Sequence, residues 1–358
     1  MLIKMQVGEQ DRGELQVNVT DSDNAPIRDA RVTISEPETA INPNSPIERL
    51  ETDVSGQTQI VDLNTPPLEY SLNENNENMP YANYNIQIEA PGYETENISN
   101  VEILPDSLSL QDVRMRRREG EQVENIDIDP HTLYAEYPEK IPEDEIKDVN
   151  EPGEIVLSRV VIPEYVVVHN GTPSSNARDY YVTYKDYIKN VASSEIYATW
   201  PRATIEANVL AIMSFTLNRV YTEWYRNKGY DFTITSSTAY DQKWIYGRNI
   251  FQSIDEVVDE IFNQYLSRPD VRQPILTQYC DGKRVTCPNW LSQWGSCNLG
   301  EQGFGTLEII RNYYGDDMYI NTAEQIQGIP SSWPGANLDI GSSGQKVRQL
   351  QEQLNLIG

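Results

Sequence analysis

Glu195 is the residue whose surroundings in the sequence most directly suggest chemistry. Ile196 and Tyr197 follow it and Trp200 comes shortly after, so apolar and aromatic side chains flank the carboxyl group. Desolvation beside such neighbours raises the pKa of a carboxyl, and a protonated carboxyl can act as a general acid. A glutamate beside aromatic residues is more often a surface residue, so composition alone leaves both interpretations open.

The three cysteines form a second group of potentially reactive residues. Cys280 and Cys287 bracket the turn-rich residues DGKRVT, and Cys297 follows. The first two can close a local disulfide in an oxidising compartment or remain free thiols. If a disulfide forms, we predict this pair, because it closes a short loop, with Cys297 left apart.

Length and charge limit the classes of function. The chain has 358 residues and a formal charge of −27, which predicts two or three domains. Nucleic acid is excluded as a partner, because its binding depends on cationic contacts to phosphate. The N-terminus lacks the apolar core of a signal peptide, and no apolar run of about 18 residues occurs, so neither a signal peptide nor membrane insertion is expected.

A long buried helix is predicted directly after Glu195. Pro201 suits a first helical position, and apolar residues from Ile205 to Leu217 recur on most sides of a run that extends to Lys228. Gly229 is the predicted stop.

Two further helices are predicted in the same region, which we interpret as a central α+β domain, residues 156–326. One begins at a capping box, Ser253–Glu256, and ends before Pro269. The other runs from about Thr306 to Tyr314 and is stopped by a glycine.

The N-terminal residues 12–116 predict an all-β sandwich. Leu15, Val17 and Val19 alternate with polar residues at strand period, as does a second run beginning at Val32. The turns at Thr52–Gly56 and Ala90–Tyr93 resemble those of carboxypeptidase regulatory-like and collagen-adhesin B-type domains. That resemblance implies a spacer, adhesive or assembly module, with self-assembly or a surface partner as its role.

Residues 117–155 form an acidic connector that contains several prolines. Its charge predicts a solvated, extended spacer. Ile126, Ile128 and the stretch HTLYAEYP are apolar enough for an ordered strap, which is the alternative.

Two motifs, SSEIYATWPRATIEANVLAIMSFTLNR at Ser193–Arg219 and LSQWGSCNLGEQGFGTLEIIRNYYG at Leu291–Gly315, resemble the stage II sporulation protein D family of peptidoglycan lytic transglycosylases. The resemblance covers about Tyr180 to Ile320. It implies that Glu195 is the catalytic acid and base, because in this reaction the sugar's own hydroxyl attacks and one carboxyl suffices.

The same resemblance implies a glycan groove of amide and aromatic side chains, which suit the hydroxyls and apolar faces of sugars. The residues implied as substrate-binding are Asn208, Gln242, Tyr246, Ser292, Gln293 and Trp294. For Gln242, Tyr246, Ser292, Gln293 and Trp294, a core or loop-stabilising role is weighted equally with sugar contact. Zinc is a weak possibility at Cys280 and Cys287, because the family's histidine is missing, and no cofactor is otherwise implied.

The chain departs from the family pattern near the groove. Ala203, Glu206 and Met213 replace a glutamate, a lysine and an arginine, and Asn208 replaces a glutamine. Glu206 could be a relocated acid, although a helix glutamate satisfied by Arg202 or Arg219 is favoured. These changes allow a domain that binds glycan without cutting it.

The C-terminal residues 327–358 resemble a linker and the first part of a peptidoglycan-binding domain. Together, these features predict a peptidoglycan-directed lytic transglycosylase, associated with a spore or cell wall, whose partner is the glycan strand. The alternative is a non-catalytic structural or assembly protein of a spore or cell-surface structure that binds wall glycan.

Overall fold

The computed structural model describes residues 10–37, 46–118, 123–147 and 159–323. The chain is a mixed α/β, β-rich protein that divides into two compact units. Unit 1 comprises Met1–Glu136, Ser193–Arg202 and Ile245–Glu256, and unit 2 comprises Tyr137–Ala192, Ala203–Trp244 and Val257–Gly358. Two short segments of the interval predicted as one central domain, 156–326, therefore group with the N-terminal unit. The predicted C-terminal segment, 327–358, lies outside the described residues.

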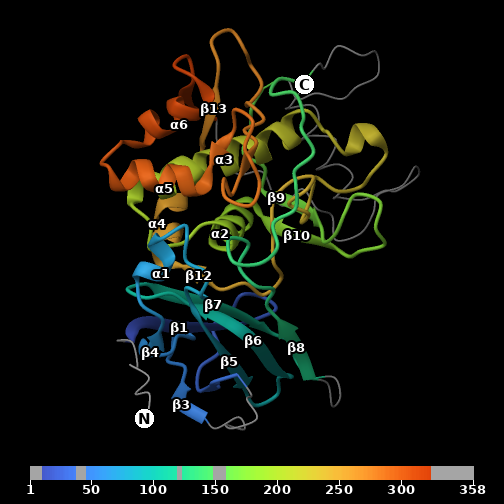
Figure 1. The fold of residues 1–358 in the computed structure, drawn as a ribbon. Helices are drawn as coiled ribbons and strands as arrows, with labels where there is room; N and C mark the ends of the chain where they lie inside the picture. The colour runs from blue at the N-terminus through green and yellow to red at the C-terminus, as the bar shows by residue number, and fades with distance from the viewer. Residues whose placement is uncertain (1–9, 38–45, 119–122, 148–158, 324–358) are drawn as a thin grey trace, which may run out of the picture. The chain divides into compact units, whose positions relative to one another are not determined.

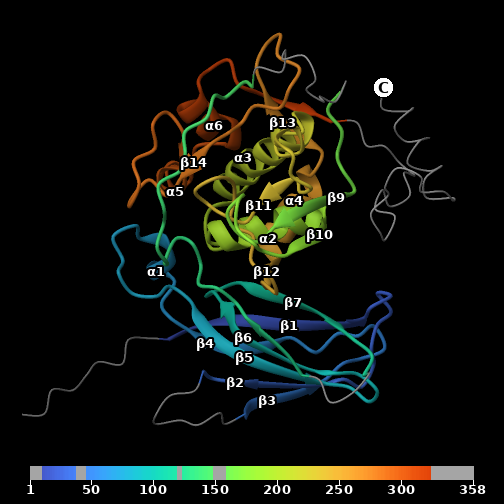
Figure 2. The same ribbon diagram turned by 90° about the vertical axis from the view of Figure 1, so that its right-hand side faces the viewer.

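Unit 1 contains two β-sheets that face each other (Figures 1 and 2). The four-stranded sheet has the order β12-β7-β1-β4, formed by Ile250–Phe251, Leu108–Met115, Asp11–Asp21 and Val61–Thr65. The five-stranded sheet has the order β3-β2-β5-β6-β8, formed by Pro46–Glu51, Arg31–Ser35, Ala82–Glu89, Thr95–Ile103 and Val123–Asp127. The predicted sandwich is present, but it is not purely antiparallel, because β1 pairs with β7 and β6 with β8 in parallel.

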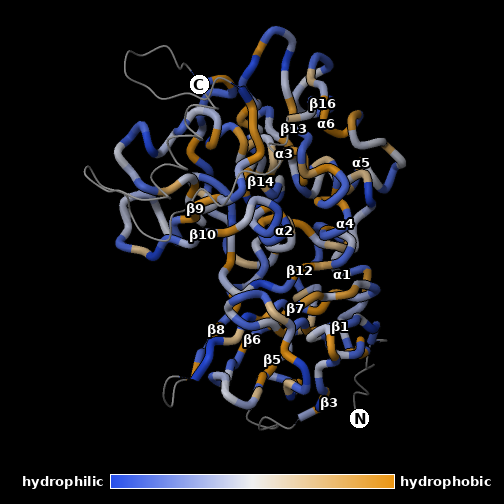
Figure 3. The backbone as a smooth tube through the Cα atoms, turned by 180° about the vertical axis from the view of Figure 1, so that it is seen from behind, coloured by the Kyte–Doolittle hydropathy of each residue, from blue (hydrophilic) through white to orange (hydrophobic). Residues whose placement is uncertain are grey.

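Alternating apolar side chains build the core between these sheets. Leu15, Val17 and Val19 of β1 are fully buried and belong to one cluster with Ile86 and Ile88 of β5. The alternation along the strands can be followed in Figure 3. Burial of each such side chain contributes about 1.5–3 kcal/mol, so the pattern that predicts the strands also stabilises the sandwich.

The turn at Gly56 requires glycine. Its φ is 75°, and a Cβ at this position would lie 2.4 Å from the carbonyl oxygen of Val19. Positive φ is disfavoured for residues with a side chain, and the close approach of the Val19 carbonyl leaves no room for a Cβ. The turn joins β3 to β4 and brings Asp53 and Gln57 to the end of the sandwich.

The described part of the acidic connector is ordered. Val123–Asp127 forms edge strand β8, and Ile128, His131 and Leu133 are buried. The strap interpretation therefore describes this part of the chain, whereas residues 148–158 lie outside the described residues.

Unit 2 is organised around α3 (Arg202–Tyr221), of which nearly every residue is buried. It also holds a three-stranded sheet and a series of shorter elements. The sheet has the order β10-β9-β11, formed by Asp179–Thr183, Tyr165–His169 and Ile234–Thr235. The other elements are α2 (Tyr184–Glu195), α4 (Gln252–Ile261), α5 (Gln293–Glu301), α6 (Thr306–Tyr314), β13 (Gln264–Ser267) with β16 (Tyr319–Thr322), and β14 (Tyr279–Cys280) with β15 (Leu291–Ser292); α2 and α4 each extend into unit 1.

The predicted length of α3 was wrong at its C-terminal end. The helix ends at Tyr221 rather than Lys228, because Glu223 adopts a left-handed φ of 46° that breaks the helical path. A short 3-10 helix, η1 (Arg226–Lys228), follows, and Gly229 caps this element. The helix predicted at Thr306–Tyr314 is present with those bounds.

No described helix combines the length and apolar character that a bilayer crossing requires.

Candidate functional site

Glu195 is the last residue of α2, and its side chain has 0% exposure. The residues that follow it are buried too: Ile196 is 0% exposed, Tyr197 2% and Trp200 3%. The apolar neighbours predicted from the sequence are therefore present. They enclose the carboxyl instead of lining an open surface.

The backbone around Glu195 is held by donors from distant parts of unit 1. The carbonyl of Ser193 accepts from Arg248 Nη2 at 2.8 Å, and that of Ser194 accepts from the amide and hydroxyl of Thr132 at 3.0 and 2.7 Å. The carbonyl of Ala198 accepts from the hydroxyl of Ser253 at 3.1 Å. Each such bond contributes about 1 kcal/mol, so the segment Ser193–Arg202 is fixed along most of its length.

His131 and the ring of Trp200 complete this attachment. His131 Nδ1 accepts from the amide of Leu133 at 3.2 Å, which assigns the ring proton to Nε2, 3.3 Å from the carbonyl oxygen of Ile196. The imidazole also lies 4.5 Å from the ring of Tyr197. Trp200 Nε1 donates to the carbonyl of Ser71 at 2.9 Å.

The residues predicted to form a groove with Glu195 are divided between the two units. Tyr246 belongs to unit 1, is half-buried, and donates its hydroxyl to Glu124 at 3.3 Å. Gln242 belongs to unit 2 and is fully buried; its Nε2 donates to the carbonyl of Ile212 at 3.1 Å, and its Oε1 accepts from Tyr187 at 3.1 Å. These contacts match those of core amides.

The second motif forms the start of α5 in unit 2. Ser292 is its N-cap and accepts from the amide of Gly295 at 2.9 Å, while Gln293 and Trp294 are buried. Asn208 of α3 donates to the hydroxyl of Ser296 at 2.8 Å. Asn208 thus joins α3 to α5, and Ser292 caps α5.

Glu206 accepts a hydrogen bond from the hydroxyl of Thr306 at 2.6 Å. Of the two partners expected from the sequence, Arg202 and Arg219, Arg219 instead binds Asp241 and Glu143. Arg219 cannot serve Glu206, because the two residues project from different parts of α3.

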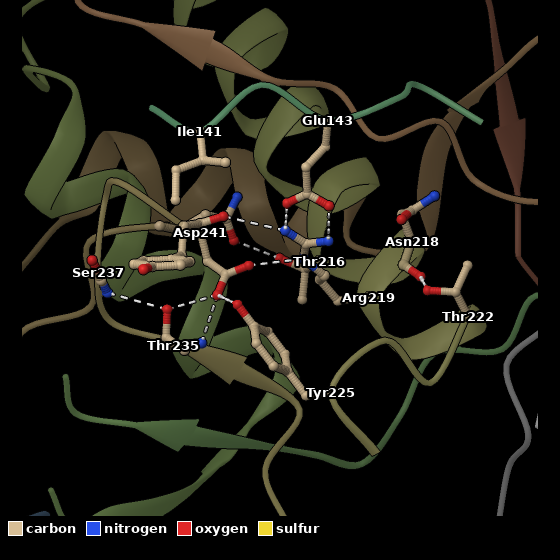
Figure 4. Close-up of polar contacts among 12 residues, drawn as sticks. Ile141, Glu143, Thr216, Asn218, Arg219, Thr222, Tyr225, Thr235, Ser237 and Asp241 are labelled. Carbon is tan, nitrogen blue, oxygen red and sulfur yellow. Dashed lines mark hydrogen bonds and ion pairs between the residues drawn. The ribbon is translucent and has the colours of Figure 1, made fainter. Parts of the chain in front are cut away.

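A buried ionic network around Arg219 is the main polar feature of unit 2 (Figure 4). Its Nε donates to Asp241 at 2.8 Å, and its two terminal nitrogens donate to Glu143 at 3.0 and 2.5 Å. Asp241 also accepts from the hydroxyl of Tyr225 at 2.6 Å and from Thr235 at 2.6 Å. The sequence signal for such a network is an arginine at the end of an otherwise apolar helical run.

The pKa shifts in this network follow from its geometry. Burial alone would raise the pKa of Glu143, but hydrogen bonds and charges from Arg219 and Lys147 outweigh it and lower the pKa. Burial lowers the pKa of Lys228 to about 8, and the charges of Arg219 and Lys147 add to that effect. The residues of this network stabilise unit 2. Lys228, at the margin of the network, has an exposed side chain.

An open cavity of about 700 Å³ lies within unit 1. It is bounded by β1, the β2–β3 edge of the five-stranded sheet, and the Gly56 turn. Its lining residues are mostly polar and charged: Gln16, Arg31, Arg49, Leu50, Glu51, Asp53, Gln57, Thr58 and Gln59. Sequence reasoning missed this site, because its residues share no motif.

Cys280 and Cys287 are joined in a disulfide with a Cα–Cα distance of 5.7 Å, and Cys297 is buried and takes no part in it. Disulfide sulfurs are not thiolates, so this pair lacks the donors that zinc requires. Among the described residues, no group of three or more acidic, histidine or cysteine side chains could hold a metal ion.

Neither a protein-family comparison nor a comparison with curated proteins finds a match for this chain. Similar solved structures include catechol 1,2-dioxygenase from Acinetobacter radioresistens, at 13% identity and a TM-score of 0.22 over 33% of this chain and 58% of that one. The minor pilin of Streptococcus agalactiae shows 17% identity and a TM-score of 0.22 over 32% of this chain and 48% of that one. Hydroxyquinol 1,2-dioxygenase from Pseudomonas putida shows 12% identity and a TM-score of 0.21 over 31% and 58%. The chain thus spans about half the length of these proteins, and such low TM-scores carry no argument about function.

These findings overturn the predicted family. No family matches, and the similar solved structures are dioxygenases and a pilin instead of sporulation proteins or peptidoglycan lytic transglycosylases. The two sequence motifs misled because most of their implied site residues are core, capping or helix-joining residues here. Without the family, the case for a catalytic Glu195 rests on its local composition alone.

Proposed function

We propose that the chain is a non-catalytic structural or attachment protein of a cell surface that binds glycan without cleaving it. The observation that supports this proposal is the complete burial of Glu195. A general acid must come within hydrogen-bonding distance of the glycosidic oxygen. A side chain with no exposed surface does not meet that requirement.

The surroundings of Glu195 support a structural role for its segment. Arg248, Thr132 and Ser253 donate to three of its carbonyl groups, and Trp200 anchors it to Ser71. Exposing the carboxyl would require breaking several of these contacts together, at about 1 kcal/mol each or more. Reopening a groove here is therefore costly.

The outer face of the five-stranded sheet supports the glycan-binding part of the proposal. Gln87 Nε2 donates to Asn97 at 3.0 Å, and Asn97 Nδ2 donates to Asn125 at 3.0 Å, so a row of amides crosses β5, β6 and β8. Amide side chains suit sugar hydroxyls because they both donate and accept hydrogen bonds.

Sedimentation with bacterial sacculi from which the stem peptides have been removed tests this function. We expect the protein to sediment with the sacculi, and mass spectrometry to find no 1,6-anhydro or reducing sugars released. Glu195→Gln should bind equally, because its side chain does not reach the ligand.

Release of anhydro-sugars by the native protein and its loss in Glu195→Gln would overturn the non-catalytic assignment. Absence of sedimentation would overturn glycan binding. Glu206→Gln serves as the matched control, since Glu206 is the alternative acid on the neighbouring helix.

A further inference from the structure

The cavity of unit 1 has a rigid wall of side chains that are already hydrogen-bonded. Gln16 Nε2 donates to the carbonyl of Thr58 at 3.0 Å, and the hydroxyl of Thr58 accepts from the amide of Val17 at 3.0 Å. Asp53 accepts from the amides of Ser55 and Gln57 at 2.8 and 3.1 Å, which fixes the turn. This wall is formed before any ligand binds, and preorganisation reduces the entropic cost of binding.

A second set of lining groups is exposed and available. Among the described residues, no hydrogen bond or ion pair engages the side chains of Arg49, Glu51, Gln57 or Gln59, and all four are exposed. Arg49 and Glu51 lie on the same face of edge strand β3, because residues two apart in a strand project to one side. Donors and acceptors therefore stand side by side at the cavity.

The charges in the cavity decide the class of ligand. Arg31 and Arg49 are balanced by Glu51 and Asp53, so the cavity has no net charge, and the chain as a whole carries −27. An anion would meet two carboxylates and an unfavourable overall field, and a cation would meet two guanidinium groups. Neutral hydroxyl groups can bind both kinds of side chain, since carboxylates accept and guanidinium groups donate.

The size of the cavity agrees with a small saccharide. Small-molecule sites commonly measure about 300–1,000 Å³. The cavity measures about 700 Å³, and its lining is mostly polar.

We propose that this cavity, between edge strand β3 and the Gly56 turn, binds a neutral saccharide through the side chains of Arg49, Glu51 and Gln57. The assignment rests on the proposed glycan-binding function and names where and by which chemistry the glycan is held.

Calorimetric titration of the full chain with a neutral tetramer of N-acetylglucosamine and with an acidic tetramer of galacturonic acid tests the proposal. We expect the neutral tetramer to bind and the acidic one to bind at least tenfold more weakly. Arg49→Ala and Gln57→Ala should each weaken binding of the neutral tetramer about tenfold, the usual effect of losing a hydrogen bond to ligand. Arg28→Ala is the matched control, because Arg28 is an exposed arginine of the same unit outside the cavity lining.

The outcomes separate this site from the function on which it rests. If the native protein sediments with sacculi but Arg49→Ala and Gln57→Ala bind the tetramer normally, the cavity assignment is wrong and the proposed function stands. Preference for the acidic tetramer would overturn the ligand class. If the native protein binds neither tetramer and does not sediment with sacculi, both the cavity assignment and the proposed function are wrong.

Discussion

Each unit of the chain buries an arginine against a carboxylate, yet the two sites differ in how completely their groups are paired. In unit 1, Arg248 contacts Glu102 at 2.8 Å, and both side chains are almost fully buried. In unit 2, Arg219 contacts Asp241 and Glu143. The first site holds a single ion pair, beside which Arg248 donates to the carbonyl of Ser193, whereas the second is a network of ion pairs.

The two sites differ in how many of their buried polar atoms lack a hydrogen-bond partner among the described residues. Glu102 Oε1 and Arg248 Nη1 are buried without a hydrogen-bond partner among the described residues. Arg219 uses all three of its nitrogens, and Glu143 also accepts from Lys147 at 2.5 Å. A buried charge is stabilised only when its partners replace the lost water.

The two carboxyl groups consequently shift in opposite directions. Burial raises the pKa of Glu102 to about 7, and Arg248 offsets only part of that effect. The pKa of Glu143 is lowered, because Arg219 and Lys147 outweigh its burial. The number of donors, more than the presence of an arginine, decides whether a buried carboxylate stabilises the fold.

The largest expected effect is that of Arg219→Met. This change leaves Asp241, which is 0% exposed, as an uncompensated buried charge, so unit 2 should lose about 3–5 kcal/mol of unfolding free energy. Urea denaturation followed by tryptophan fluorescence measures the loss. Arg226→Met is the control, because Arg226 is about half exposed and its ion pair with Glu223 is 3.5 Å long. A loss below 1 kcal/mol for Arg219→Met would contradict the network interpretation.

Arg248→Met should cost less, and its cost should depend on pH. Glu102 can take up a proton near neutrality and so avoid remaining as a lone buried charge. We expect a loss of roughly 1–3 kcal/mol at pH 8 and a smaller one at pH 5. The double variant with Glu102→Gln should recover most of the loss at pH 8. A cost independent of pH would show that the charge of Glu102 is not the cause.

The contrast between these sites also shows what could be predicted from the sequence. Strands of unit 1 were predictable because Leu15, Val17 and Val19 alternate, and α6 was predictable because Gly315 follows a periodic run. The burial of Glu195 was not, because the groups that hold its segment come from Thr132 and Arg248, far along the chain. Local spacing carries no information about such long-range partners.

The same limit explains why the contacts of the site residues could not be predicted from the sequence. Gln242 looked like a groove amide because amides suit sugars, yet its partners Ile212 and Tyr187 belong to two helices that only the tertiary fold brings to it. The cavity at Arg49 and Gln57 was missed for a different reason. Seven of its nine lining residues lie between Arg49 and Gln59 but share no motif, and Gln16 and Arg31 join them only in the tertiary fold.

Stability of the native chain should change with pH in opposite senses in the two units. Glu102 has a folded pKa of about 7, above its unfolded value of 4.5, so its contribution is full below pH 4.5 and is lost as the pH rises to about 7. Glu96, raised to about 7 mainly by burial, acts in the same sense. Glu143 has a lowered pKa, so its contribution is present above pH 4.5 and is lost as the pH falls below that value.

Hydrogen exchange read by mass spectrometry can follow the two units separately in one sample. Between pH 5 and 7.5, after correction for intrinsic exchange rates, we expect β6 to lose protection by roughly 1–2 kcal/mol while α3 does not. Glu102→Gln should abolish part of the loss in β6. Equal changes in both units would remove the distinction drawn between the two sites.

The smallest expected effect concerns Lys228, at the margin of the Arg219 network. Its ammonium lies over the ring of Trp224, and burial together with the charges of Arg219 and Lys147 lowers its pKa to about 8. Glu143 opposes this shift, but it is already paired with Arg219 and Lys147. A lysine of lowered pKa is a stronger nucleophile near neutrality, because more of it is the free amine.

At pH 8, an amine-reactive ester should therefore label Lys228 several times faster than Lys185, which forms an ion pair with Asp259 at 3.1 Å. Peptide mass mapping at short times measures both rates. Arg219→Met should slow the labelling of Lys228 by removing a neighbouring positive charge, and an unchanged rate in that variant would show that burial alone accounts for the shift.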